Sequence, residues 1–524
     1  MSDAGSSTQA PPAEPPGPPA TPAPAGAKAA RGQSSRRHAK VKARHRAPSQ
    51  GARAVTYVRA HLPEWPRITG PEAALALAVV LGPLAIGAVH VPTRIVLAVL
   101  LTVALAWAAF RMHRDEQRVR AGWIGLGLLA ALGWTFLQWV PLPIGLVEAL
   151  HPQAAEAARR ASEVTGAEAP SWLPLTLDMS RTATAFASLM AVTAAYLLAA
   201  SLRRDADVKA RIVIYVELAA LAVLGVGALH EVLGLHQIYG VYKGSVDLGG
   251  VPFLTSFVNP NHAAALMLLG SLTALGTSLA PDRHQRWHLA VGIALAIGVA
   301  LSMSRANAIL LVVGLVLVTL PALFMRRHRE MRGRAVRLVV GAGLCLFVAV
   351  ILMGPERWIA EFSALDSGGF GAVGVVTHCW STGLEAALAA PWTGVGNGAL
   401  GLATAVHITD WNGGLVTHAH QGFIQVGADL GFVAGAGVVL LVLGGFVVCA
   451  WRAAKDLAAW GLVVALLAVG LQNIVDFSLW ILGVGIPAAA ILGVLVHATW
   501  PSAHFSGIGP QSPEGEARAR VWHG

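Results

Sequence analysis

Long apolar runs separated by short polar segments dominate the chain after residue 70. Each run is rich in Leu, Val, Ala and Gly and is long enough to cross roughly 30 Å of hydrocarbon as a helix. We predict about twelve such spans, which begin near residues 71, 92, 122, 183, 212, 261, 289, 306, 338, 423, 456 and 479. The pattern therefore predicts an all-α, multi-pass membrane protein whose helix bundle covers residues 67–500.

The composition excludes the soluble classes of protein. Of the 524 residues, 55% are hydrophobic and only 13% are charged, which differs strongly from an average soluble domain. Cys345, Cys379 and Cys449 are widely separated, so we expect neither a disulfide framework nor a cysteine metal site. We also find no motif for a cofactor or for nucleic acid, and we expect none to bind.

The two ends of the chain differ from the apolar region. Residues 1–66 are a Pro/Ala-rich tract followed by a basic polar stretch, and neither part can bury a core. We predict a disordered tail here and a second tail over residues 501–524. The first apolar run begins only near Pro71, so no signal peptide is expected. A basic run is usually just solvated, and contact with anionic lipid headgroups is the alternative.

Lys and Arg are distributed unevenly between alternate connections of the predicted bundle. The connections 111–120, 203–211, 281–288, 326–337 and 452–455 hold 18 of them, whereas the other connections, which include the longest, hold 7. By the positive-inside rule the first group faces the cytoplasm. Both termini are then cytoplasmic, and the net charge of +10 belongs mainly to the inner face and the first tail.

The longest outward loop, residues 354–420, is partly apolar, so we expect it to fold onto the bundle. Within it, the sequence HCWSTGLEAALAA predicts a short helix along the membrane surface that ends at Pro391. The apolar side of this helix is expected to carry Trp380, Leu384, Ala387 and Leu388.

A glycine-rich segment, GVGNG, follows this predicted helix. Gly394, Gly396 and Gly398 permit a tight turn, and amides exposed in such a turn could bind phosphate oxygens. A simple turn between helices is the more frequent role of such a segment. Its composition alone does not decide between the two.

Several motifs, in order, resemble the O-antigen ligase and polymerase superfamily. They are TSFVNPNHAAALMLL, LSMSRANAI, GVGNGALG, THAHQGFIQVGADLGFVAG and QNIVDFSLWILGVGIPAAAILGVL. The most specific sign is His420 followed eleven residues later by Gly431, with Gln421 where relatives usually have Ser or Asn. The resemblance covers roughly residues 70–500.

The resemblance implies a membrane glycosyltransferase. Such proteins transfer a glycan from a polyprenyl diphosphate carrier to an acceptor hydroxyl at the periplasmic face of the bacterial inner membrane, without a nucleotide sugar, cofactor or essential metal. The acceptor is a second lipid-linked glycan for a polymerase, and a lipid A core or a protein for a ligase. The motifs do not distinguish these two. Attack opposite the departing diphosphate would invert the anomeric configuration.

The chemistry of this reaction selects two catalytic candidates. The diphosphate gains negative charge as the glycosidic bond breaks, so its site needs fixed cations at headgroup level. Arg305, in the SxSR motif, is such a cation, and simple snorkelling to the interface is the alternative. His420 is the candidate base for the acceptor hydroxyl, with His418 secondary, although a histidine at a helix mouth is more often a solvated or capping residue.

One position departs from the family pattern. Relatives commonly carry an arginine about two residues before Trp380, where this chain has His378. Protonated His378 could bind the diphosphate, or Arg181 or Arg357 could supply the second cation. The sequence does not choose among the three.

Further polar residues lie near these motifs. Asn259, Asn261 and His262 could bind donor or acceptor sugars, and ordinary N-capping of the helix that follows is an equal alternative. Asp429 and Asp476 fall inside or beside apolar runs, and we interpret them as structural residues that hold the outer loop in place.

A membrane transporter of a lipid-linked or small substrate is the main alternative function. Glu217, His230, Glu231, Asp429 and Asp476 could form a route for a substrate or for protons. Two features weigh against it. No sequence repeat relates the two halves of the chain, and the candidate chemistry lies at the outer surface rather than at the midplane.

Overall fold

The computed structural model describes residues 68–499 apart from 117–118, 120, 203–205, 244–250, 281–283, 364–371 and 406–415. The two predicted tails, residues 1–66 and 501–524, lie outside the described residues. The described chain is helical except for its loops and one ribbon, in which β1 (Leu142–Pro143) pairs antiparallel with β2 (Trp172–Leu173). The prediction of an all-α, multi-pass membrane protein is confirmed.

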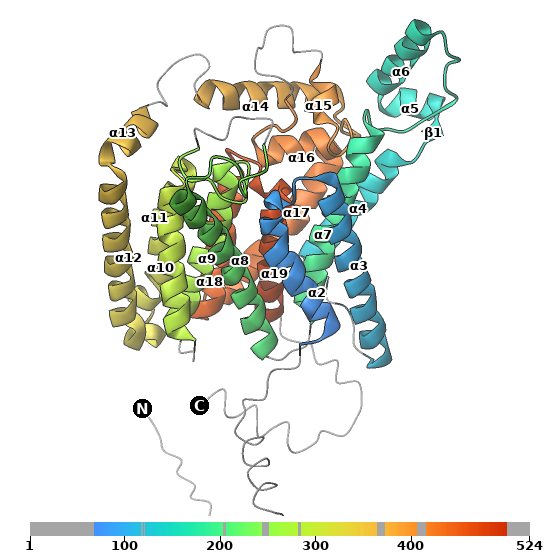
Figure 1. The fold of residues 1–524 in the computed structure, drawn as a ribbon. Helices are drawn as coiled ribbons and strands as arrows, with labels where there is room; N and C mark the ends of the chain where they lie inside the picture. The colour runs from blue at the N-terminus through green and yellow to red at the C-terminus, as the bar shows by residue number, and fades with distance from the viewer. Residues whose placement is uncertain are drawn as a thin grey trace, which may run out of the picture. The chain divides into compact units, whose positions relative to one another are not determined.

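Long helices run alternately in opposite directions through the described bundle (Figure 1). They are α2 (Gly70–Leu84), α3 (Val91–Arg114), α4 (Gly122–Trp139), α7 (Met179–Ser201), α8 (Ala206–Leu233), α9 (Pro260–Leu279), α10 (Gln285–Leu301), α11 (Arg305–Phe324), α12 (Arg332–Met353), α17 (Phe432–Ala453), α18 (Leu457–Gln472) and α19 (Leu482–Thr499). Among the described residues, 8 helices are long and apolar enough to cross a membrane, and α2, α10 and α18 are shorter apolar helices. The total of about twelve spans stays a prediction.

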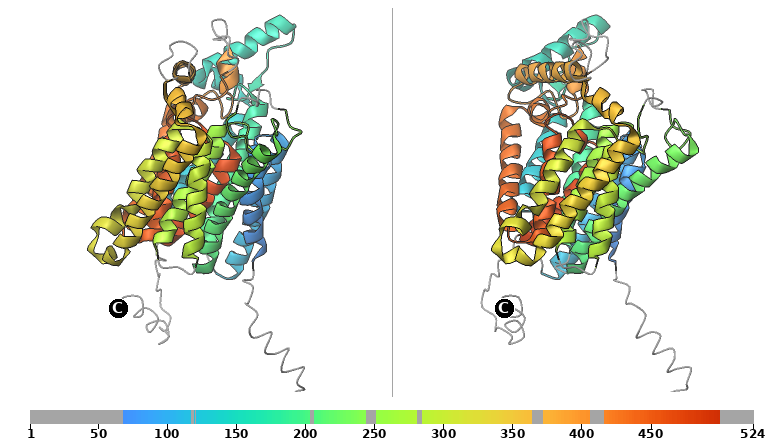
Figure 2. Two further views of the ribbon diagram at one scale, coloured as in Figure 1. Left: turned by 60° about the vertical axis from the view of Figure 1, so that its left-hand side comes forward. Right: turned by 90° about the vertical axis from the view of Figure 1, so that its left-hand side faces the viewer.

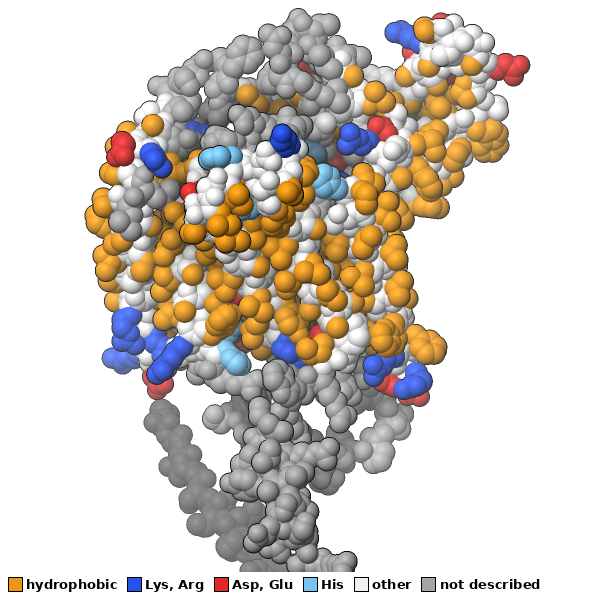
Figure 3. Space-filling model, viewed as in Figure 1, with side chains coloured by type: hydrophobic (Ala, Val, Ile, Leu, Met, Phe, Trp, Pro, Cys, Tyr) orange, Lys and Arg blue, Asp and Glu red, His pale blue; other side chains and the backbone are white. Residues whose placement is uncertain are grey.

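The two ends of the bundle differ in structure and charge. One end, here called the loop end, carries the short helices α5 (Ile144–Leu150), α6 (Pro152–Thr165), α13 (Pro355–Ser363), α14 (Ala372–Ala389), α15 (Leu400–Ala403) and α16 (Gly422–Leu430) (Figure 2). At the other end, here called the basic end, Arg111 and Arg114 lie in the last turn of α3 and Arg452 in that of α17. Figure 3 shows Lys and Arg gathered at that end, below a band of apolar side chains.

Helices α9 and α19 form the centre of the bundle. In the 18-residue apolar stretch of each helix, 94% of the residues of α9 and 89% of those of α19 are buried. A Cβ atom on Gly276 of α9 would lie only 2.3 Å from the Cα atom of Gly461 on α18. Helices α9 and α18 therefore touch backbone to backbone at this point. Larger side chains would prevent such a close approach.

The buried ionisable groups inside the bundle form local networks. The Oε1 atom of Glu217, in α8, lies 2.6 Å from Nδ1 of His288. Its Oε2 atom accepts a hydrogen bond of 2.9 Å from Nε1 of Trp287. Near the basic end, Glu72 of α2 accepts hydrogen bonds of 2.6 and 3.0 Å from Arg211 of α8. Each network joins one helix to its neighbour, which gives these residues a structural role.

One predicted span begins later than expected. The run that starts at residue 423 is divided into α16 and α17, and only α17 is among the helices long enough to cross a membrane. Gly431, between them, has a φ of +81°, and a Cβ atom there would lie 2.6 Å from the carbonyl oxygen of Trp392. The turn at this glycine interrupts the helix although the residues on both sides are apolar.

The predicted surface helix is present as α14, which lies across the loop end (Figure 1). On this helix Leu384 and Leu388 are 42% and 60% exposed whereas Ala387 is fully buried, so the apolar side expected to lie along the membrane surface stays a prediction. Ala386 and Ala387 belong to a small core that also contains Ala419 and Ala428. Small side chains let α14 lie close to α16, so its alanine face is the one that packs.

Replacing Gly431 with alanine should destabilise the protein by about 3 kcal/mol, because the side chain meets backbone atoms and the left-handed conformation becomes strained. Thermal unfolding of the purified protein in detergent would measure this loss. Gly437→Ala in α17 is the matched control, since nothing lies within 4 Å of the added Cβ atom. Equal melting temperatures for the two variants would contradict the packing argument.

Candidate functional site

Three histidines from two distant segments surround one aromatic ring at the loop end. His418 stacks on Phe477 with a centroid distance of 4.1 Å and an interplanar angle of 11°. His420 and His262 meet the same ring edge-on at 4.7 and 4.9 Å. We call these four residues the histidine cluster. The structure thus brings together three predicted site residues around a phenylalanine that the sequence analysis did not select.

Asp476 lies directly beside the histidine cluster. Its Oδ1 atom is 3.5 Å from Nε2 of His262 and accepts a hydrogen bond of 2.8 Å from the amide of Phe477. Its Oδ2 atom accepts one of 2.6 Å from Gln472. Burial alone would raise the pKa of Asp476, but the interactions with His262, with the amide of Phe477 and with His420 together outweigh it and lower the pKa. An ionised carboxylate therefore faces the imidazoles.

The two histidines that precede α16 are neutral at pH 7. Burial lowers the pKa of His418 to about 3, and electrostatic interactions with His420, His262 and Arg94 act in the same direction. Burial also lowers the pKa of His420, while the charge of Asp476 opposes this shift. A neutral imidazole is the form that can accept a proton from a hydroxyl group.

The backbone at His420 is held in an unusual conformation. The φ angle of His420 is +50°, in the left-handed region that residues other than glycine rarely adopt. Nε1 of Trp380, on α14, donates a hydrogen bond of 3.0 Å to the carbonyl oxygen of His420. The preceding amide, of Ala419, donates one of 2.8 Å to Oε1 of Gln425. Strain fixed in this way by neighbouring contacts is frequent at functional sites.

Gln421, which departs from the family pattern, still starts the next helix. It is the N-cap of α16, and its side-chain oxygen accepts a hydrogen bond of 2.6 Å from the amide of Ile424. The amide of Gly422 donates one of 2.7 Å to the carbonyl oxygen of Asn473. Glutamine thus supplies the capping oxygen that Ser or Asn would supply, and α16 is anchored to the loop that carries Asp476.

The glycine-rich turn is used for packing. The amide of Gly394 donates to a backbone carbonyl 2.9 Å away, and that of Gly398 donates to Oδ1 of Asp429 at 3.1 Å. A Cβ atom on Gly396 would lie 2.0 Å from Oγ1 of Thr176. The amides of Gly394 and Gly398 are therefore engaged within the protein, which weakens the hypothesis that this turn binds phosphate.

Asp429 ties this turn to α16. Its Oδ2 atom accepts a hydrogen bond of 3.0 Å from Nε2 of Gln425, the residue whose Oε1 atom holds the amide before His420. Burial raises the pKa of Asp429 to about 7, while the hydrogen bonds from Gln425 and Gly398 oppose the shift. The sequence analysis interpreted Asp429 as structural, and these contacts support that interpretation.

Arg305 is the first residue of α11, at the loop end. On the same turn, Nδ2 of Asn307 donates hydrogen bonds of 2.8 Å to Oγ of Ser304 and 3.2 Å to the carbonyl oxygen of Asn261. The start of α11 is thereby tied to the start of α9, which carries His262. Arg305 and His420 thus lie at the same end of the bundle.

Asn259, by contrast, acts as the N-cap of α9. Its side-chain oxygen accepts a hydrogen bond of 2.8 Å from the amide of Asn261. This contact supports the capping role that was the alternative for this residue. The predicted sugar contacts of Asn259 and Asn261 stay predictions.

Two arginines at the loop end interact through their charges, and the sequence analysis named only one of them as a candidate cation. Arg94 is in the first turn of α3 and Arg181 in that of α7, and their charges interact with each other. The charge of Arg94 also reaches His418. Nε of Arg94 is buried without a hydrogen-bond partner. Two neighbouring cations with an unsatisfied buried donor are typical of an anion site.

The other two candidates for the second cation lie elsewhere on the loop end. His378 is on α14, two residues before Trp380, with Nε2 3.5 Å from Oγ1 of Thr382. Arg357 is exposed on α13, which packs against α12. Arg94 would have been found in the sequence by its position, as one of the few basic residues in the outward connections.

Comparison with protein families adds to this geometry. Residues 289–439 match the family model described as O-antigen ligase. These residues are similar to the O-antigen ligase family, and we call them the O-antigen ligase segment. The resemblance that the sequence motifs predicted is thereby confirmed over these residues. No curated protein matches the chain.

The O-antigen ligase segment does not contain the whole site. It includes Arg305, Trp380 and His420, whereas His262 and Phe477 lie before and after it. The contacts across Phe477 join the O-antigen ligase segment to the rest of the bundle.

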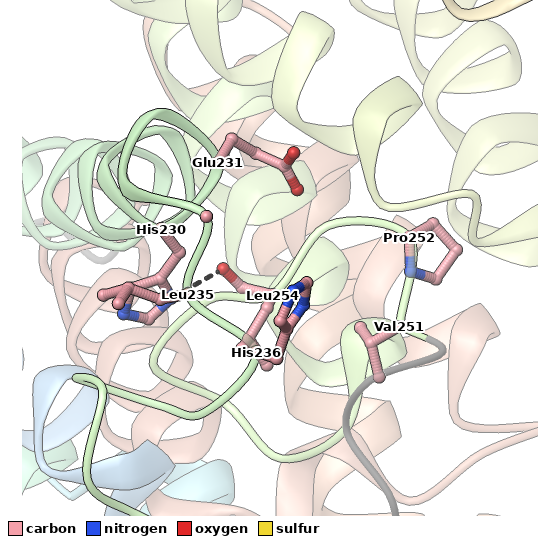
Figure 4. Close-up of a pocket in the computed structure, with 8 residues that line it drawn as sticks. His230, Glu231, Leu235, His236, Val251, Pro252 and Leu254 are labelled. Carbon is pink, nitrogen blue, oxygen red and sulfur yellow. Dashed lines mark hydrogen bonds between the residues drawn. The ribbon is translucent and has the colours of Figure 1, made fainter.

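A separate cavity of about 220 Å³ lies at the end of α8, outside the O-antigen ligase segment (Figure 4). His230, Glu231 and His236 line it together with Leu254. Nδ1 of His230 lies 3.0 Å from the carbonyl oxygen of Leu254, and Nε2 accepts a hydrogen bond of 3.1 Å from the amide of Tyr239. Both ring nitrogens of His230 are therefore occupied by structural contacts.

Proposed function

We propose that the protein is a membrane glycosyltransferase that moves a glycan from a polyprenyl diphosphate carrier to an acceptor hydroxyl. It would act as an O-antigen ligase or as a polysaccharide polymerase. The observation that carries this proposal is the position of His420 in one cluster with His418 and Phe477, together with Arg94, whose charge reaches His418. Together with the O-antigen ligase match, this supports a base and an anion site for one reaction.

In the proposed reaction, His420 accepts the proton of the acceptor hydroxyl as its oxygen attacks the anomeric carbon. The bond between this carbon and the diphosphate oxygen breaks, and the electron pair leaves with the diphosphate. Attack from the opposite face inverts the anomeric centre. Asp476 stabilises the imidazolium that forms. The products are the new glycoside, polyprenyl diphosphate and protonated His420, which then loses its proton to water.

Arginines supply the positive charge for the leaving group in this proposal. Arg94, Arg181 and Arg305 would contact the diphosphate oxygens, whose charge grows in the transition state. The proposed step therefore needs no metal ion and no cofactor. His418, whose pKa is about 3, is a weaker base than an ordinary histidine, and we assign it with His262 and His378 to contacts with substrate.

We infer that the loop end faces the periplasm and that the basic end faces the cytoplasm of a bacterial inner membrane. The basic residues at the ends of α3 and α17 support this orientation. Both termini would then be cytoplasmic. The partners are membrane lipid, the lipid-linked donor and a glycan, a lipid A core or a protein as acceptor.

A reconstituted assay tests the proposed function. Purified protein in lipid vesicles would receive polyprenyl diphosphate with a radiolabelled glycan, together with either a second lipid-linked glycan or a lipid A core. Release of polyprenyl diphosphate with growth of the lipid-linked glycan supports a polymerase, and label on lipid A supports a ligase. Transport of intact donor or another solute without cleavage would overturn the proposal in favour of a transporter.

Glycans from a strain without the gene give an independent result. Loss of a polymerase leaves single repeat units on the carrier, whereas loss of a ligase leaves long chains that are not transferred. Wild-type glycans in such a strain would contradict both forms of the proposal.

The rate of transfer should rise with pH, and its half-maximal value should lie below about pH 6.5. Only neutral His420 can accept the proton, and burial lowers its pKa below the ordinary value of a histidine. Initial rates between about pH 4 and 8 at saturating donor would measure this profile. A rate that rises only above about pH 8 would assign the base to another group.

A further inference from the structure

Two buried polar side chains lie one turn apart on α16, next to the strained turn that carries His420. Gln425 and Asp429 are 2% and 3% exposed. Nε2 of Gln425 donates a hydrogen bond of 3.0 Å to Oδ2 of Asp429. Oε1 of Gln425 accepts one of 2.8 Å from the amide of Ala419. We call Gln425 and Asp429 the carboxyl–amide pair, and it connects a buried carboxyl group to the backbone directly before His420.

The carboxyl end of this pair is fixed to other parts of the protein. Oδ1 of Asp429 accepts a hydrogen bond of 3.1 Å from the amide of Gly398, and its backbone carbonyl accepts one of 2.7 Å from Nε2 of Gln138. Gln138, in α4, is fully buried, and its Oε1 atom accepts a hydrogen bond of 3.1 Å from the amide of Asn397. Asp429 is thus held by α4 and by the glycine-rich turn, so it is a stationary support for Gln425.

The amide end of the pair holds the turn between two imidazoles. Ala419 lies between His418 and His420, whose rings contact Phe477 at centroid distances of 4.1 and 4.7 Å. The φ angle of His420 is +50°, and such a conformation persists only where surrounding contacts hold it. Trp380 binds the carbonyl oxygen on one side of this residue, and Gln425 binds the amide on the other. Loss of either contact would let the turn relax and the imidazole move.

We propose that the carboxyl–amide pair positions the imidazole of His420 through the amide of Ala419. This inference rests on the proposed function, in which His420 is the base. A glutamine side chain ends in one acceptor and one donor group, so its oxygen can face the amide only while its nitrogen faces an acceptor. Asp429 supplies that acceptor and thereby selects the orientation of Gln425.

Removal of the amide group tests the proposal directly. Gln425→Leu keeps a side chain of similar size without either hydrogen bond. It should lower kcat by about 10²-fold, a loss typical of a reacting group displaced by about 1 Å, and leave KM for the donor nearly unchanged. Initial rates in vesicles over a range of donor concentrations separate the two constants. A wild-type kcat in Gln425→Leu would overturn the proposal.

An exchange of the two groups is the sharper test. Asp429→Asn places an amide nitrogen opposite Nε2 of Gln425, and rotation of Gln425 only moves this conflict to the amide of Ala419. Asp429→Asn should therefore also lower kcat. Protonation of Asp429 is less disruptive, because a hydroxyl oxygen still accepts a hydrogen bond whereas an amide nitrogen does not.

Adding Gln425→Glu to Asp429→Asn restores an acceptor for each donor and keeps the size and net charge of the pair. This double variant should recover most of the lost kcat. A double variant that is no more active than Asp429→Asn would overturn the proposal.

Two controls separate positioning from stability. Asp456→Asn makes the same substitution at the N-cap of α18, where asparagine caps about as well as aspartate, and should leave kcat unchanged. The losses in the single variants should persist well below their melting temperatures in detergent. A loss that disappears at such temperatures would reduce the pair to a stabilising role and overturn the proposal.

Hydrogen exchange at the amide of Ala419 gives a readout that does not require catalysis. Exchange should be about tenfold faster in Gln425→Leu and in Asp429→Asn, because the amide loses its acceptor, and should slow again in the double variant. Unchanged exchange in both single variants would overturn the proposal. Absence of glycan transfer by the wild-type protein, with exchange as expected, would instead overturn the proposed function.

Discussion

Replacement of His420 with alanine is expected to lower kcat for glycan transfer by about 10²- to 10⁴-fold, the usual contribution of a positioned general base. The acceptor hydroxyl would then lose the group that takes its proton, while the arginines would still bind the donor. Initial rates with a lipid-linked donor in vesicles would measure the loss. Donor binding by crosslinking should change little.

The conformation of His420 requires a second variant. Its φ angle of +50° is tolerated by asparagine better than by alanine, so His420→Asn removes the imidazole and disturbs the backbone less. We expect the two variants to lose activity to the same extent. Full activity of His420→Asn would show that the backbone turn, and not the imidazole, is what the reaction needs.

Replacement of Arg305 with alanine is the second large effect, a loss of about 10²- to 10³-fold in kcat/KM for the donor. The missing cation would leave the developing charge on the diphosphate without a partner. Arg305→Lys should recover part of the loss, since it keeps the charge but not the planar fork of donors. Initial rates at low donor concentration would measure each value.

Two comparisons test the proposed anion site further. Arg94→Ala should cause a similar loss, because the charge of Arg94 reaches His418 and its buried Nε atom has no hydrogen-bond partner. Arg357→Ala is the control, since Arg357 is an exposed cation of the same loop end. A loss in Arg357→Ala as large as that in Arg305→Ala would point to a general effect of surface charge.

Hydrophobic periodicity predicted the helices well because the membrane imposes one rule on every span. A run of apolar residues must satisfy its own backbone hydrogen bonds, so it forms a helix wherever it lies. The error at residue 423 has a local cause. Gly431 stops α16 by its conformation, and composition on either side does not reveal a φ angle.

The site was predicted in part. Motifs selected His262, His418 and His420, and the structure brings them together. Phe477, which joins them, is an apolar residue in an apolar stretch and carries no signal of its own in the sequence. Its importance comes from contacts between segments about 60 to 200 residues apart, and a single sequence does not contain that information.

The close contact between α9 and α18 holds two parts of the histidine cluster and its neighbour Asp476 in a fixed relation. Gly276 and Gly461 hold these helices backbone to backbone. One helix begins with the turn that carries His262, and the other leads into the loop with Asp476 and Phe477. Sliding of either helix is blocked at this contact. In a thicker or thinner bilayer, α9 and α18 should therefore tilt together as a rigid pair. The spacing of His262, Asp476 and Phe477 should then stay unchanged.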